Sequence, residues 1–103
     1  MTNLPNPSEH QETYAKRLEK DGEREYTIRK ALREHFDLPI ADIIAICNEL
    51  PVAREREIAD LRTRFPDLNQ NRFAWKISKT LTIPKEDALT WSQTIVPAAE
   101  DTD

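Results

Sequence analysis

Side chains suited to recognising nucleic acid or protein gather between Pro51 and Leu81. This stretch has seven Arg and Lys residues against four Asp and Glu residues, a net charge of +3 in a chain whose net charge is −4. Within it, positions 69–72 have the sequence Asn-Gln-Asn-Arg. Asn and Gln can form paired hydrogen bonds with adenine, and Arg with guanine. If residues 69–81 form the second helix of a helix-turn-helix, these side chains would face the major groove of DNA.

The same stretch can also form a plain pair of packed helices that binds another protein. Helices predicted over 52–65 and 69–81 would be joined by a three-residue turn, and an Asn-rich helix start is ordinary capping chemistry. The turn lacks the usual glycine, and the net acidic charge opposes non-specific attraction to phosphates. Trp75 falls off the stripe formed by Phe73 and Ile77, and tryptophan is enriched at protein-binding hot spots. We therefore favour a protein partner and keep DNA as the alternative.

Eight side chains form the predicted contact surface for either partner. They are Arg62, Arg64, Asn69, Gln70, Arg72, Trp75, Lys76 and Lys79. The favoured function is that of a small regulatory protein, an adaptor or inhibitor of a larger macromolecular machine, and chains of this size and composition also occur as accessory factors of phages and plasmids. The alternative is a transcriptional or accessory factor that binds DNA through helices 52–65 and 69–81.

No arrangement of residues predicts catalysis, a cofactor or a bound metal ion. His10 and His35 have no Cys or His at metal-ligand spacing. Cys47 lies in an apolar run without a neighbouring cation, which favours a small core residue over a nucleophile. A glycine-rich phosphate loop is excluded because Gly22 is the only glycine. We therefore expect a protein that is not an enzyme and that has no cofactor.

The elements that must position these side chains are predicted to be helices. Hydrophobic residues make up 38% of the 103 residues and charged residues 33%, a balance typical of amphipathic helices around a thin core. Seven prolines and a single glycine argue against tight β-hairpins. We expect an all-α fold, a single small bundle of four to five helices over residues 12–96. Residues 1–11 should form a disordered lead, and residues 97–103 an acidic disordered tail.

Gly22 interrupts the first helical segment, residues 12–36, inside a run of charged residues. A glycine in the middle of a helix costs roughly 1 kcal/mol relative to alanine. The packed part of this helix is therefore expected to begin near Arg24. Residues 12–21 are expected to be a frayed or partner-dependent extension.

Residues 12–36 also offer a surface for a homodimer. Their apolar spacing resembles a heptad pattern, but too few heptads are intact for a sustained coiled coil. Charge pairs four residues apart, such as Glu25 with Arg29, indicate a solvated face.

The helix over 39–50 is predicted to be the core element, because a helix that is apolar nearly all round is normally buried. Its apolar residues are Ile40, Ala41, Ile43, Ile44, Ala45, Ile46, Cys47 and Leu50. The helices over 52–65 and 69–81, and a last one from Pro84 that Pro97 closes, should surround it. The helix over 69–81 is expected to begin with Asp67 or Asn69 as its N-cap, and its expected inward residues are Phe73, Ala74, Ile77 and Leu81. Trp91, on the last helix, is expected to lie in the core nearby.

Nothing in the sequence predicts export or insertion into a membrane. Residues 1–8 lack the charged and apolar regions of a secretory signal, and the longest apolar run, residues 43–47, is far too short to span a bilayer. A single cysteine allows no internal disulfide, which is compatible with a reducing compartment. We expect a cytoplasmic protein with no membrane partner.

Overall fold

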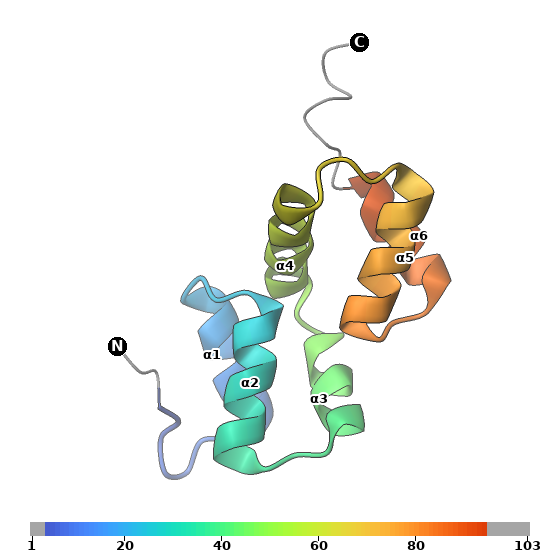
Figure 1. Ribbon diagram of the computed structural model, residues 1–103. Helices are drawn as coiled ribbons and strands as arrows, with labels where there is room; N and C mark the ends of the chain where they lie inside the picture. The colour runs from blue at the N-terminus through green and yellow to red at the C-terminus, as the bar shows by residue number, and fades with distance from the viewer. Residues whose placement is uncertain (1–3, 95–103) are drawn as a thin grey trace. The chain divides into compact units, whose positions relative to one another are not determined.

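The computed structural model describes residues 4–94, and within that range the chain forms six α-helices and no strand (Figure 1). The helices are α1 (Gln11–Lys20), α2 (Glu25–Phe36), α3 (Ile40–Cys47), α4 (Pro51–Arg64), α5 (Gln70–Leu81) and α6 (Lys85–Thr94). The predicted all-α fold is confirmed, with six helices where four to five were expected. The chain divides into two compact units, which we call unit 1 (residues 1–57) and unit 2 (residues 58–103).

Some of the predictions concern residues that the structure leaves out. Residues 1–3 and 95–103 lie outside the described range, and with them lie the predicted acidic tail over 97–103 and the last predicted turn of the final helix. The predicted division into a lead over 1–11 and a bundle over 12–96 therefore stays a prediction. None of the helices in the described part is long and apolar enough to cross a membrane.

Helix α1 is well packed, so the expectation of a frayed extension over 12–21 is wrong. Three of its residues are buried in the core of unit 1, namely Tyr14, Ala15 and Leu18. Gly22 lies beyond the end of α1 with a φ of +100°, a conformation that glycine adopts without steric cost. The N–H groups of Gly22 and Glu23 donate to the carbonyls of Glu19 and Leu18, both at 3.1 Å. This pair of bonds is a Schellman turn, which ends one helix and lets the next begin.

The core of unit 1 gathers side chains from α1, α2, α3 and the start of α4. It consists of Tyr14, Ala15, Leu18, Ile28, Leu32, Ile43, Ile46, Cys47, Leu50 and Ala53. Helix α3 gives only one face to this core, so the expectation that it is buried nearly all round is wrong. Ile40 is 60% exposed, and Ala41 and Ala45 are exposed as well. The short α3 packs on α1 and α2 with its Ile43 side, and this leaves its opposite side uncovered within unit 1.

Buried charges join α2 to α4 inside unit 1. The carboxylate of Glu25 is fully buried and accepts hydrogen bonds from Nε and Nη2 of Arg54 at 2.8 and 3.0 Å. It also accepts one from Nε of Arg29 at 2.7 Å. A buried charge is tolerated only where it is paired and hydrogen-bonded in this way. The predicted pair of Glu25 with Arg29 is present, but the solvated face expected around it is wrong, because Glu25 points at Arg54.

The N-terminus of α4 is held by residues distant in the sequence. Oε2 of Glu19 accepts from the backbone N–H groups of Val52 and Ala53 at 2.9 and 3.0 Å. These are among the N–H groups that the first turn of a helix leaves without intrahelical partners. Further along α4, the buried Glu57 accepts from the backbone N–H of Tyr26 at 2.7 Å. The start of α4 is therefore fixed by contacts with α1 and α2.

Unit 2 is built from the second half of α4 and the hairpin of α5 and α6. Its core consists of Ile58, Leu61, Phe73, Ala74, Ile77, Leu81, Ile83 and Ala88. The four inward residues predicted for the helix over 69–81 are all buried. Asn69 caps α5 by accepting from the N–H of Arg72 at 2.9 Å, as one of the two predicted caps. Trp91 packs against this core with its side chain half-buried, which fits its predicted place.

Candidate functional site

A groove runs along the first turns of α5 in unit 2. It has a volume of about 490 Å³, and it is lined by Phe65, Leu68, Asn71, Arg72, Trp75 and Lys76. We call it the α5 groove. Phe65 and Leu68 come from the connection between α4 and α5, and the other four come from α5 itself. An apolar hollow with a few polar side chains at its edge is the usual form of a binding site.

Trp75 is the most exposed aromatic side chain of unit 2 among the described residues. The buried stripe of α5 contains Phe73, Ala74 and Ile77, and this turns Trp75 outward, where 54% of it is exposed. Nζ of Lys79 lies 5.3 Å from the centre of a Trp75 ring, close enough for a cation–π contact. The sequence places Trp75 off the stripe formed by Phe73 and Ile77, and in the structure its side chain lies on the surface.

Three cations lie beside Trp75 along one stripe of α5. Arg72, Lys76 and Lys79 are spaced four and three residues apart, so they share one side of the helix. Nζ of Lys76 lies 4.5 Å from the centre of the Phe65 ring. Within residues 4–94, none of the three forms an ion pair with a carboxylate. Cations in this state can pair with an anionic ligand without first breaking an ion pair.

The other predicted contact residues have different surroundings. Arg62 is buried, and Nη1 of its guanidinium donates to the carbonyls of Phe65 and Leu68 at 3.3 and 2.7 Å. It therefore shapes the connection between α4 and α5 from the inside. The exposed Arg64 pairs with Asp60 at 3.0 Å. Asn69 uses its side chain as a cap, and Gln70 beside it is exposed.

The structure thus brings three of the eight predicted residues into the groove, with a fourth next to it. Arg72, Trp75 and Lys76 line the groove, and Lys79 lies over the Trp75 ring. Sequence reasoning missed Phe65, Leu68 and Asn71. Two of these residues could have been found from the sequence, because Phe65 and Leu68 are apolar and lie on either side of Pro66 and Asp67. A turn at a proline keeps such residues out of the buried face of a helix and close to each other.

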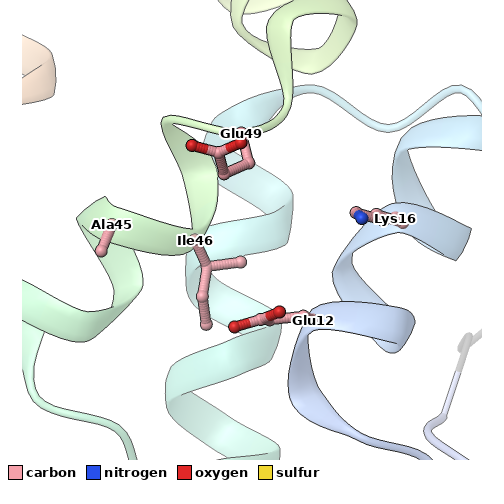
Figure 2. Close-up of a pocket in the computed structure, with 5 residues that line it drawn as sticks. All are labelled: Glu12, Lys16, Ala45, Ile46 and Glu49. Carbon is pink, nitrogen blue, oxygen red and sulfur yellow. The ribbon is translucent and has the colours of Figure 1, made fainter.

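A second hollow, of about 350 Å³, lies between α1 and α3 in unit 1. Figure 2 shows its lining, with Glu12 and Lys16 from α1 and with Ala45, Ile46 and Glu49 from α3 and the residues after it. No Ser, Thr, Cys or His side chain lines it. Across the described residues there is also no group of three or more His, Cys, Asp or Glu side chains placed to hold a metal ion.

The residues considered for chemistry from the sequence have structural surroundings. Cys47 is buried, and this burial raises the pKa of its thiol to about 12, which keeps the thiol protonated and unreactive at neutral pH. His10 caps α1, with its Nδ1 accepting from the N–H of Glu12 at 3.2 Å. His35 packs edge-on against the Tyr14 ring, with the ring centres 6.0 Å apart. None of these contacts brings a nucleophile next to a base.

Comparison with known proteins adds no relative to this picture. The sequence matches no protein-family model, and neither the curated proteins nor the solved structures include a chain similar enough to count as a match. The function is therefore inferred from the geometry of the chain itself.

Proposed function

We propose that this chain is a non-enzymatic binding protein, an adaptor or inhibitor that docks onto a partner protein through the α5 groove. The observation that carries the proposal is Trp75, a large aromatic side chain more than half exposed beside an apolar groove. Leaving such a side chain in water forgoes a burial free energy of roughly 1.5–3 kcal/mol or more. Covering it with a partner recovers that free energy, which is why tryptophan is enriched at interface hot spots.

The cations around Trp75 complete the arrangement of a protein interface. Fully covered anchors at the centre supply most of the affinity, and charged residues at the rim supply orientation and association rate. Trp75 with Phe65 and Leu68 provides the centre, and Arg72 with Lys76 provides the rim. Leu18, Ile28 and Leu32 of residues 12–36 are buried inside unit 1, so the homodimer considered for that segment has less support.

The proposal can be tested with a random-peptide display library selected on the full chain. Peptides that bind in the α5 groove should lose roughly thirty-fold in affinity for Trp75→Ala, the factor that corresponds to a hot-spot loss of about 2 kcal/mol. Tyr26→Ala is the matched control, because Tyr26 is 57% exposed and also lies under a cation, with Cζ of Arg24 5.5 Å from its ring centre. Selected peptides that bind both variants like the wild-type chain would contradict the proposal.

DNA binding is the second candidate, supported by the stripe of Arg72, Lys76 and Lys79 on α5. Two observations weigh against it. The connection between Arg64 and Gln70 is five residues long instead of the predicted three, longer than the usual turn of a helix-turn-helix. The net charge of the chain is −4. A gel shift with duplex DNA would decide, since binding through phosphates should fall steeply between about 50 and 200 mM salt.

A further inference from the structure

We propose that the partner segment held by the α5 groove is acidic, with one large apolar side chain flanked by carboxylates. This inference depends on the proposed function, and it adds the chemistry of the partner. It is drawn from the charge and the shape of the groove. A volume of about 490 Å³ accepts one large side chain with its neighbouring backbone.

The charge of α5 selects against a neutral or basic partner. The helix has three cations, Arg72, Lys76 and Lys79, and no Asp or Glu among its twelve residues. No carboxylate lines the groove either, so a partner meets positive charge at its rim and apolar surface at its floor. Like charges facing each other across an interface suppress wrong partners, and opposite charges steer the right one.

The present contacts of the lysines show what would change on binding. Lys76 and Lys79 now lie over the rings of Phe65 and Trp75, at 4.5 and 5.3 Å from the ring centres. An apolar anchor that enters the groove would take the place of the ammonium groups on these ring faces. Carboxylates beside the anchor would then receive the displaced ammonium groups. An acidic segment with an apolar anchor would cover the aromatic rings and also pair with the lysine ammonium groups. A purely acidic segment would leave the rings exposed.

A nucleic acid would also bring negative charge and flat apolar surfaces. Single-stranded nucleic acid binds by stacking bases on aromatic rings within a positively charged groove. Leu68, an aliphatic residue, shares the floor with Phe65 and Trp75, and the chain outside this stripe is acidic. An aliphatic floor residue offers no ring for a base to stack on, so the floor suits an apolar side chain better than a run of bases.

The test uses the full chain and three short fluorescein-labelled peptides, read by fluorescence anisotropy. The first peptide has a central Phe-Leu pair between runs of Glu and Asp, the second has Gln and Asn in place of the acids, and the third has Ser-Ser in place of Phe-Leu. We expect the first to bind, and the other two to bind at least about ten-fold more weakly. Lys76→Glu should weaken the first peptide by a similar factor. Lys85→Glu is the matched control, because it makes the same charge change at an exposed residue of unit 2 that does not line the groove.

Each outcome separates the inference from the proposed function. Equal binding of the acidic and the neutral peptide, both lost in Trp75→Ala, would overturn the acidic partner and leave the protein-binding groove standing. Trp75-dependent binding of a single-stranded thymidine oligonucleotide in place of the peptides would overturn both. Binding of the first peptide that Lys76→Glu and Lys85→Glu weaken to the same extent would also overturn the inference, because it would report only the net charge of the chain.

Discussion

Replacing Glu25 with Gln should destabilise the protein strongly, although this changes few atoms. Glu25 is fully buried, and its carboxylate is the common acceptor of Arg54 and Arg29. The side chain of Arg54 is itself only 7% exposed, so the neutral amide would leave its charge buried without a counter-ion. Removing one partner of a buried pair costs roughly 3–5 kcal/mol. Because Gln keeps one acceptor oxygen, we expect a loss near the lower end, about 3 kcal/mol, out of a total of roughly 5–15 kcal/mol.

Asp60→Asn is the matched control for this substitution. Asp60 also pairs with an arginine, Arg64, but the two side chains are 37% and 53% exposed, and such surface pairs contribute roughly 0–1 kcal/mol. Urea unfolding followed by circular dichroism gives both free energies by linear extrapolation. If Glu25→Gln cost no more than Asp60→Asn, the assignment of a stabilising role to the buried charges would be refuted.

The double variant Glu25→Leu with Arg54→Met tests whether the stability depends on the pairing of the two charges or on each charged side chain by itself. Replacing a whole buried ion pair by apolar side chains of similar volume is often close to neutral. The double variant should therefore be more stable than either single variant. A loss equal to the sum of the two single losses would indicate that the two side chains do not act as a pair.

Three further predictions concern single residues and can be measured by the same urea unfolding. Gly22→Ala should lower the free energy of unfolding by roughly 1–3 kcal/mol, because the φ of +100° strains any residue with a Cβ. If Gly22 lay inside a helix instead, the same substitution would raise the free energy of unfolding by about 1 kcal/mol. Thr82→Gly should raise the free energy of unfolding by up to about 1 kcal/mol, because the β-branched Thr82 ends α5 in the left-handed region with a φ of +56°. An unchanged or lower free energy of unfolding would argue against backbone strain at Thr82. Burial raises the pKa of Cys47 to about 12, above roughly 8.5 for a free thiol, so the unfolded chain loses this proton first. The stabilising contribution of Cys47 should therefore be complete below about pH 8.5 and decline as the pH rises toward 12, and Cys47→Ala should show a shallower decline than the wild-type chain in this window.

The sequence predicted well those features that depend on neighbouring residues. The helix over 69–81 has the expected bounds to within one residue, its four inward residues are buried, and Asn69 caps it. Periodicity and capping are local signals, and they were sufficient here. Gly22 was located correctly as an interruption, but the sequence alone does not distinguish a glycine that weakens a helix from a glycine that ends one. Only the Schellman bonds around it distinguish the two.

Features that depend on distant residues could not be predicted from the pattern. Arg54, Glu57 and Arg62 are charged residues of α4, and all three are buried because their partners come from other elements or from a turn that had first to form. The α5 groove has the same origin. Trp75 and the cations of α5 were singled out from the sequence, but the floor made by Phe65 and Leu68 depends on how the chain turns at Pro66.

The carboxylate of Glu19 at the start of α4 also has a consequence for the order of folding. Helix α5 is capped by Asn69, three residues from the N–H that it accepts from, so its first turn can form as soon as its own segment contracts. The carboxylate at the start of α4 comes from 33 residues earlier in the chain, and it arrives only after a long loop has closed. Contacts of such sequence separation form slowly and late. During refolding, the first turn of α4 should therefore gain protection against hydrogen exchange later than the first turn of α5. This order is expected although the local sequence does not oppose helix formation at the start of either helix.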